Sequence, residues 1–262
     1  MTLCIVRGAG DVGSAVAHAL FHAGYPVMLH DAVAPGYHRR GMSYADTLFD
    51  GTSILAGLIG KRARDVNDLP QMLRCRRAIP VSSDAFDAVV DLLCPTVLVD
   101  ARMRKRVVPE IQRGMAPMTI GLGPNFTAGG IVDVAVETAW GAQLGAVISQ
   151  GATRPLAGEP RPIDGIGRER NVYAPIAGTL ITIRQIGDVV CQGEAVATVG
   201  GQVLFAPISG RLRGLTRNGV EVTRGSKIIE IDPRGDSAHC FGIGERPSRI
   251  AEGVLAAVVA RE

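Results

Sequence analysis

The sequence predicts an α/β protein, with a Rossmann-like, mainly parallel sheet domain over residues 1–150 and a small all-β domain over residues 172–234. Two observations predict the sheet domain: a glycine fingerprint directly after the first apolar run, and apolar runs that alternate with stretches of helical periodicity. A third observation predicts the β domain, because two copies of a short β pattern must pack together to bury their apolar faces.

The chain opens with a predicted strand, glycine turn and helix. The apolar run at residues 3–6 leads into Gly8-x-Gly10-x-x-Gly13, after which apolar residues recur at helical spacing. Gly8 permits a tight turn, Gly10 leaves room for a phosphate, and Gly13 lets the helix pack closely on the strand. The turn is expected to bind a nucleotide through Gly8, Gly10, Asp11 and Gly13. The alternative is a glycine turn that only packs the helix on the sheet.

The second strand and the loop after it supply charged candidates. Residues 27–29 form the predicted strand, and Asp31 follows at about the offset where an acid binds a ribose hydroxyl. In the next loop, Arg39 and Arg40 lie where a second phosphate group of a nucleotide is expected. Two solvated loop arginines are the alternative. A short helix is predicted over residues 43–49.

The rest of the sheet domain alternates between strands and a helix. Strands are predicted at residues 54–59, 78–81, 96–99 and 118–122, with a helix over 84–93. Ligands of such sheets bind beyond the carboxyl ends of the strands. The residues that follow these ends are cofactor-binding candidates, namely Arg102, Gly123 and Asn125. Asp100 is a catalytic candidate, and a buried ion pair between Asp100 and Arg102 is an equally good interpretation.

Residues 151–171 are rich in proline, glycine and charge and are predicted to be a linker. The repeat follows: one copy begins with "YAPIAGTL" at Tyr173 and the other with "FAPISGRL" at Phe205. This pattern is similar to the barrel-sandwich hybrid fold of biotinyl and lipoyl carrier domains, which hold their cofactor on a lysine between the two halves. Here residues 199–203 join the halves and contain no lysine, so neither biotin nor lipoate is expected. The domain is predicted to dock a partner or to act as a lid.

Residues 235–262 are predicted to form a polar loop and a helix, starting near residue 248, that packs back on the sheet domain. The loop holds His239 and Cys240. Cys240 is a catalytic candidate if its pKa is lowered, and a small buried hydrophobe is the alternative.

Composition argues against several classes of function. A net charge of +3, without aromatic residues interleaved among the basic ones, argues against nucleic-acid binding. No apolar run is long enough to cross a bilayer and no signal pattern is present, so a cytoplasmic protein is expected. The 5 cysteines include no Cys-x-x-Cys pair, and no metal site is expected. The chain has 25 arginines against 3 lysines, which suits phosphate binding or reflects an arginine-rich proteome.

Several motifs taken together resemble the YqeB family. They are "VRGAGDVGSAVAHAL", "HRRGMSYADTLFDG", "VDARMRKR", "IGLGPNFTAGG", "VDVAVET", "DPRGDSAHCFGI" and "GVLAAV". The family is associated with the selenium-dependent molybdenum hydroxylase system. The first domain also looks like the nucleotide-binding half of XdhC/CoxF-type maturation factors for xanthine and carbon monoxide dehydrogenases.

The resemblance implies an accessory role in preparing or inserting the molybdenum cofactor, with a molybdenum hydroxylase apoenzyme as partner. That cofactor is a phosphorylated pterin, which fits a glycine turn flanked by arginines. An NAD(P)-dependent oxidoreductase is the alternative, in which the same glycines hold a dinucleotide. A purely structural partner with an empty glycine turn is a third. Whether the protein catalyses a reaction, and whether it forms a homo-oligomer, stay open at this point.

Overall fold

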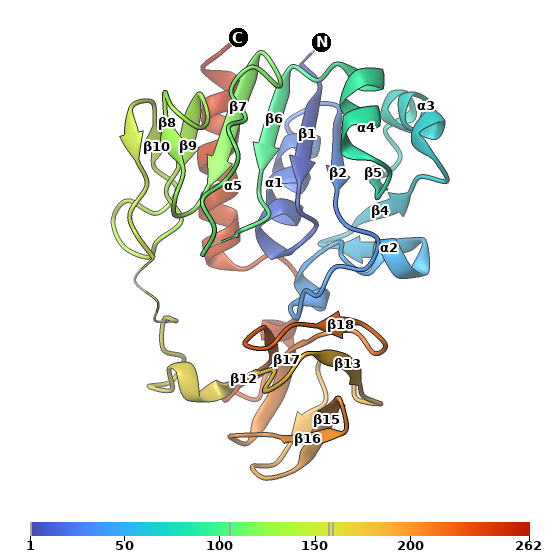
Figure 1. Cartoon of the computed structure of the whole chain (residues 1–262), viewed down its shortest axis with the longest axis vertical. Helices are drawn as coiled ribbons and strands as arrows, with labels where there is room; N and C mark the ends of the chain where they lie inside the picture. The colour runs from blue at the N-terminus through green and yellow to red at the C-terminus, as the bar shows by residue number, and fades with distance from the viewer. Residues whose placement is uncertain (1, 105, 157, 159) are drawn as a thin grey trace.

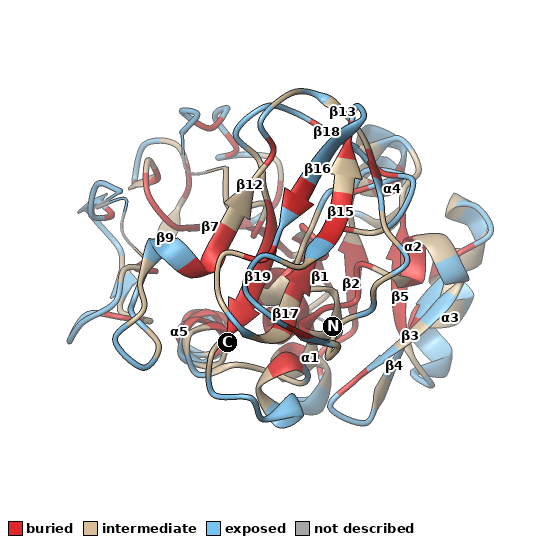
Figure 2. Cartoon of the chain, turned by 90° about the horizontal axis from the view of Figure 1, so that it is seen from below, coloured by how far each residue is buried: buried red, intermediate tan, exposed pale blue. Residues whose placement is uncertain are grey.

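Two units lie one above the other: a large α/β unit and a smaller all-β unit (Figure 1). The structure is a computed structural model that describes residues 2–104, 106–156, 158 and 160–262. In both units the central strands are largely buried, and the exposed ribbon lies in outer helices, loops and edge strands (Figure 2).

A nine-stranded sheet, in the order β10-β9-β7-β6-β1-β2-β5-β4-β3, forms the centre of the large unit. Its strands are β1 Cys4–Arg7, β2 Val27–His30, β3 Thr52–Leu55, β4 Leu58–Arg62, β5 Ile79–Ser82, β6 Val97–Asp100, β7 Met118–Leu122, β9 Val134–Val136 and β10 Val147–Ile148. Only the edge strands β3 and β10 pair antiparallel. Counted along the chain, β1, β2, β5, β6, β7 and β9 stand in the 3-2-1-4-5-6 order of dinucleotide-binding sheets. The strand order therefore reverses between β1 and β6, where such sheets bind ligands.

Helices cover both faces of this sheet, and alternate strand residues feed the two cores. Val6, Val99 and Ile120 pack against α1 Asp11–His22 and α5 Glu245–Val259 on one face. Ile5 and Leu98 face the other side, where α3 Leu69–Cys75 and α4 Phe86–Leu93 lie. The C-terminal helix α5 is thus part of the large unit, although the β unit precedes it in the chain (Figure 1).

The β unit consists of two four-stranded antiparallel sheets, in the orders β12-β19-β17-β14 and β16-β15-β13-β18. Its strands are β12 Asn171–Tyr173, β13 Gly178–Ile181, β14 Val189–Val190, β15 Ala195–Val199, β16 Gln202–Phe205, β17 Gly210–Leu215, β18 Glu221–Val222 and β19 Lys227–Asp232. The two copies of the repeat exchange strands: β14 of the first joins the sheet of the second, and β18 makes the reverse exchange. Each copy thereby buries the apolar face of the other.

The loop after β2 joins the two units. The backbone N–H of Leu215 donates to the carbonyl of His38 at 2.7 Å, and Arg40 Nε donates to the carbonyl of Leu215 at 2.8 Å. Arg217 pairs with Asp50 of α2 Thr47–Asp50. These contacts, made by backbone and side chains alike, hold the β unit in one position against the sheet unit.

Some sequence-based boundaries needed correction. Residues 54–59, expected to be one strand, belong to the β3–β4 hairpin, because Ala56 and Gly57 adopt left-handed φ angles of 47° and 81° and turn the chain. The helix expected over 43–49 begins only at Thr47, after the 3-10 turn Arg40–Met42. Helix α5 begins at Glu245, earlier than the expected start near residue 248.

The segment predicted to be a linker has structure at both of its ends. Strand β11 Gly151–Ala152 pairs with β8 Thr127–Ala128, and a 3-10 turn spans Arg168–Arg170. The remaining short helices are Val66–Asp68 and Ser237–Cys240.

Candidate functional site

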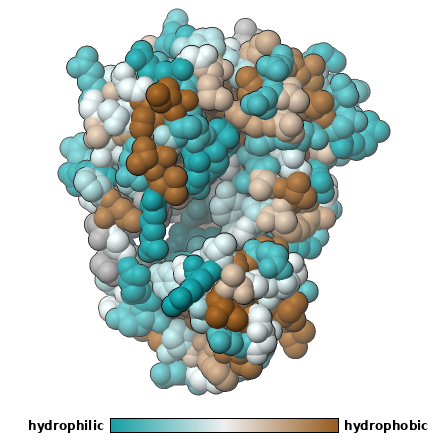
Figure 3. Space-filling view, viewed as in Figure 1, coloured by the Kyte–Doolittle hydropathy of each residue, from teal (hydrophilic) through white to brown (hydrophobic). Residues whose placement is uncertain are grey.

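A cleft of about 1010 Å³ separates the two units at the carboxyl ends of the parallel strands. Figure 3 shows this hollow between the upper and lower parts of the molecule, with hydrophilic side chains around it. The large unit contributes the N-terminal turns of α1 and α5, and the β unit contributes β17 and β19. The segment between the units contributes a third wall that includes Arg154, Arg161 and Arg170.

Positive charge dominates the lining of this cleft. The basic side chains are Arg39, Arg102, Arg154, Arg161, Arg170, Arg213, Lys227, Arg234 and Arg246. The acidic ones are Asp11, Glu137, Asp164 and Glu245. A concave surface lined by excess charge of one sign concentrates its field, so this cleft attracts anions.

A fully buried carboxylate, Glu230 on β19, organises the basic residues. Arg39 donates to it from Nε at 2.9 Å, Lys227 from Nζ at 2.8 Å, and Arg170 makes a further ion pair with it. Burial opposes the charged form of Glu230, but Arg39, His38 and Lys227 hold its pKa well below the usual range. Glu230 therefore stays ionised and fixes cations from three separate segments around the cleft.

The cations around Glu230 carry more charge than this single carboxylate balances. Burial lowers the pKa of Lys227 to about 8 even though Glu230 opposes the shift. Burial also lowers the pKa of His38 to about 4, so its imidazole is neutral at pH 7. A buried Lys or His whose pKa falls lies where a positive charge is disfavoured and a nearby anion is stabilising.

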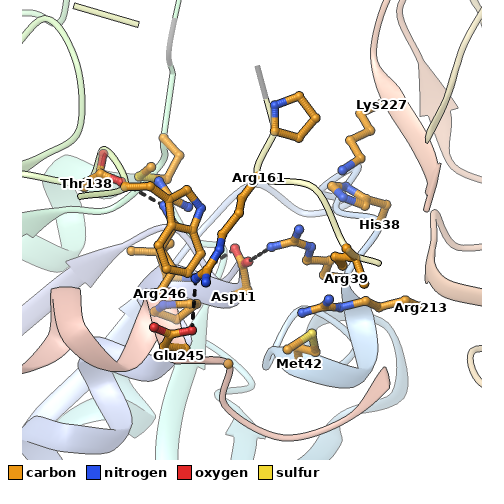
Figure 4. Close-up of a pocket in the computed structure, with 18 of the residues that line it drawn as sticks. Asp11, His38, Arg39, Met42, Thr138, Arg161, Arg213, Lys227, Glu245 and Arg246 are labelled. Atoms are coloured by element: carbon orange, nitrogen blue, oxygen red, sulfur yellow. Dashed lines mark hydrogen bonds and ion pairs between the residues drawn. The ribbon is translucent and has the colours of Figure 1, made fainter. Parts of the chain in front are cut away.

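Arg213 and Arg246, on opposite walls of the cleft, also lie where positive charge is in excess. Figure 4 shows Asp11 and Arg39 between them, with Arg39 Nη1 donating to Asp11 Oδ2 at 2.9 Å. Burial and then the charge of Arg39 lower the pKa of Arg213, whose nearest carboxylate contact is 3.4 Å long. Burial lowers the pKa of Arg246, and Arg39 adds to the effect. The guanidinium of Arg246 is held by Thr138, whose carbonyl accepts from Nε at 2.8 Å.

Side chains of the protein itself pack against the glycine turn. A Cβ atom at Gly10 would lie 2.8 Å from Cε1 of Tyr37, so the aromatic ring occupies the space expected for a phosphate. Asp31, expected to bind a ribose, instead accepts from the Tyr37 hydroxyl at 2.8 Å and from the backbone N–H of Ala9 at 2.5 Å. The loop after β2 folds back over the turn and causes both changes.

Gly8 and Gly13 have packing roles at the same turn. Gly8 has a φ of 111°, and a Cβ atom there would lie 2.7 Å from the carbonyl oxygen of Ala101 on the neighbouring strand end. A Cβ atom at Gly13 would collide with the carbonyl oxygen of Gly8. Of the predicted turn residues, Gly10 and Asp11 line the cleft.

The other predicted charged residues are bound to neighbouring groups. Arg40 Nη1 donates to Asp46 at 2.7 Å and its Nε contacts the β unit, so it joins the units. Asp100 is buried and accepts from Arg102 Nε at 3.0 Å and from Gln112 at 2.6 Å. Burial disfavours the charge of Asp100, but Arg102 outweighs it and lowers the pKa. Asp100 and Arg102 form the buried ion pair that was the alternative interpretation, and Arg102 also lines the cleft.

Gly123, Asn125 and Cys240 lie beside the cleft and contact other groups. The carbonyl of Gly123 accepts from Thr153 Oγ1 at 2.6 Å, and Asn125 Nδ2 donates to the carbonyl of Val107 at 3.2 Å. Cys240 is fully buried, and burial raises its pKa. A nucleophilic thiol needs the opposite shift, so the environment of Cys240 is that of a small hydrophobe.

Sequence reasoning missed most of the basic residues from the second half of the chain. Arg213 and Lys227 stand in the second repeat where the first has Ile181 and Ala195, and this difference between the copies was the available signal. Arg246 had no signal of its own, because only packing brings the start of α5 to the cleft.

The described residues contain neither a cluster suited to a metal ion nor a helix able to span a membrane. Among them, no group of three or more His, Cys, Asp or Glu side chains is placed to hold a metal ion. In that same part of the chain, no helix has the length and apolar character required to cross a membrane.

The chain is similar to a protein of Escherichia coli over nearly all of its length. No protein-family model matches the chain. The chain is 35% identical to "Uncharacterized protein YqeB" of Escherichia coli (strain K12) over 257 aligned residues. The aligned region covers 98% of this chain and 47% of that protein. The chain therefore spans about half the length of the relative it matches.

Similarity to solved structures is weak. An ectoine utilization protein, EutE, from Ruegeria pomeroyi is 14% identical with a TM-score of 0.26, over 88% of this chain and 85% of that one. A succinylglutamate desuccinylase/aspartoacylase from Rhodobacter sphaeroides is 16% identical with a TM-score of 0.28, over 90% and 86%. These two likenesses carry no argument about this chain, whereas nearly all of its length is similar to part of YqeB.

Proposed function

We propose that this protein is an accessory factor in the maturation of a molybdenum hydroxylase of the xanthine dehydrogenase type, and that its cleft binds a phosphate-bearing cofactor. The observation that carries the proposal is the excess of arginine and lysine around a cleft at the carboxyl ends of the parallel strands. The resemblance to the YqeB family, which the 35% identity to YqeB supports, suggests the pathway.

The donors of the cleft suit a phosphate group. Arg170 and Arg213 both line the cleft, and the buried Nε atom of each has no hydrogen-bond partner, so the protein does not use the full donor capacity of either guanidinium. The planar arginine fork binds phosphate in a bidentate way, which lysine does not. The ligand is the molybdenum cofactor or a nucleotide.

The β unit, proposed here to be a barrel-sandwich hybrid domain, supplies one wall of the cleft. It is fixed against the sheet unit by the contacts of Leu215 and Arg217, so it is suited to docking an apoenzyme beside the bound cofactor. The alternative, an NAD(P)-dependent oxidoreductase, needs a pyrophosphate at Gly10, where the ring of Tyr37 lies.

The test is reconstitution of a hydroxylase. Purified protein is loaded with molybdenum cofactor released from a molybdoenzyme, separated from free cofactor, and added to the apoenzyme of a xanthine dehydrogenase. We expect copurification of the cofactor and a gain of hydroxylase activity above that from free cofactor. Loading without any gain in activity contradicts the maturation role, and NADH or NADPH oxidation with a small carbonyl substrate supports the alternative.

A further inference from the structure

Two parallel helices direct their N-termini into the cleft. Gly10 precedes α1 and Gly244 precedes α5, and as glycines these N-cap residues provide no capping side chain. Both turns line the cleft. Unpaired backbone N–H groups and the helix dipole make a helix N-terminus attractive to anions. At α1 the turn is closed by Tyr37 and by the Asp11–Arg39 ion pair, so α5 presents the available terminus.

Arginines from both units surround the start of α5. Arg246 belongs to its first turn, and Arg213 of β17 reaches it across the cleft: Nη2 of Arg213 lies 4.0 Å from the position of a Cβ atom on Gly244. Arg170, with only 3% of its surface exposed, also lines the cleft and has an Nε atom without a partner. An oxyanion here is favoured by the helix terminus and by cations from separate segments at once.

An exposed aromatic ring lies on the same wall. Trp140 is the only tryptophan in the chain, and it is 37% exposed within the cleft lining. The guanidinium of Arg161 lies 4.5 Å from the centroid of its ring, and Arg161 in turn pairs with Glu245 beside Arg246. Thr138, two residues before Trp140, holds the guanidinium of Arg246. The ring and the cation cluster are therefore connected.

We infer that the cleft binds a phosphate ester of a planar heteroaromatic ring, with the phosphate at the start of α5 between Arg213 and Arg246 and the ring stacked on Trp140. An aromatic platform with a few fixed polar groups is the usual composition of a small-molecule site. The guanidinium of Arg161 lies over a face of this ring in a cation–π contact, 4.5 Å from its centroid. The inference rests on the proposed function and adds its ligand class and two subsites.

The experiment is calorimetric titration of the whole chain with guanosine 5′-monophosphate, guanosine and ribose 5-phosphate. We expect guanosine 5′-monophosphate to bind at least tenfold more tightly than either part. Arg246→Gln should weaken binding of both phosphate compounds about tenfold, and Trp140→Leu should weaken only that of guanosine 5′-monophosphate. Arg249→Gln, on the same helix but outside the cleft lining, is the matched control.

Three results would contradict the two proposed subsites. The first is that ribose 5-phosphate binds as tightly as guanosine 5′-monophosphate, and the second is that no nucleotide binds. The third is that a folded Trp140→Leu protein binds like the wild type. Trp140→Phe keeps a ring and should retain binding, which separates loss of stacking from loss of folding. Reconstitution of the hydroxylase is a separate readout: it tests the proposed function whether or not the titrations support these subsites.

Discussion

The two copies of the repeat in the β unit have the same backbone and different chemistry. Gly178 and Gly210 both have a φ of 154°, and Gly193 and Gly225 have φ angles of 80° and 81°. The positions that face the cleft nevertheless differ, because Arg213 and Lys227 replace Ile181 and Ala195 of the first copy. The buried Glu230 likewise replaces Thr198. Glycines and buried apolar residues define the shared fold, while the positions where the copies diverge carry the site.

The first copy presents an apolar surface where the second has charges. Ile181 is 51% exposed, and Val203 lies in the same cross-strand row, since each pairs with Thr198. Gly214 replaces Thr182 and lets the His38 imidazole pack against the second copy. The contact of His38 with the β unit therefore depends on a sequence change in the second copy.

Matched substitutions in the two copies should differ most in their effect on stability at the buried carboxylate, Glu230. Glu230→Gln leaves Arg39, Arg170 and Lys227 without their shared anion, and we expect it to lower the free energy of unfolding by about 3–5 kcal/mol. The matched change Thr198→Val in the first copy should cost less than about 1 kcal/mol. Chemical denaturation measures both, and equal effects contradict the role given to Glu230.

A smaller difference is expected at the paired glycines. A Cβ atom at Gly210 collides with the carbonyl oxygen of Asp232, whereas at Gly178 the nearest atom is the backbone nitrogen of Gly200 at 3.2 Å. Alanine is strained at both positions, so Gly210→Ala should cost about 3 kcal/mol and Gly178→Ala about 1–2 kcal/mol. Thermal unfolding compares the two variants, and a reversed order shows that the collision is relieved by movement.

Exchanging the cleft-facing residues tests where the anion binds. Arg213→Ile gives the second copy the residue of the first, and we expect inorganic phosphate to bind about tenfold more weakly, since one charge-assisted hydrogen bond contributes about 1.5–3 kcal/mol. Ile181→Arg places an arginine in the first copy, outside the cleft lining, and should leave phosphate affinity unchanged. Isothermal titration provides the measurement. Unaltered binding by Arg213→Ile removes that residue from the site.

The weakest expected effect is the pH dependence of phosphate binding. Lys227 has a pKa of about 8 in the free protein, and a bound anion favours its charged form. Affinity should therefore decrease as the pH rises above about 8, by no more than tenfold per pH unit. Lys227→Met should flatten the profile between pH 7 and pH 9. A wild-type profile that stays flat over this range shows that Lys227 does not sense the ligand.

Local patterns predicted the strand–turn–helix start, the parallel sheet and the two-copy repeat, because each depends on residues near one another in the chain. The same reasoning located Arg39 and Arg102, which follow strand ends and line the cleft. It gave no sign of Tyr37, which packs against Gly10 from beyond the next strand. Nothing local to Gly10 indicates that an aromatic ring returns over it.

By itself, the sequence determined most of the central strands and the helices packed on them, since periodicity, glycine positions and repeat spacing are local properties. Only the tertiary structure decided what surrounds the cleft, because Arg39, Arg170, Arg213 and Arg246 come from segments far apart in the chain. Glu230 on β19 pairs with Arg39 and Arg170 from two distant segments, and α5 returns to the sheet unit after the whole β unit in the chain. Charge placement of this kind depends on how the two units pack, and no short stretch of sequence encodes that packing.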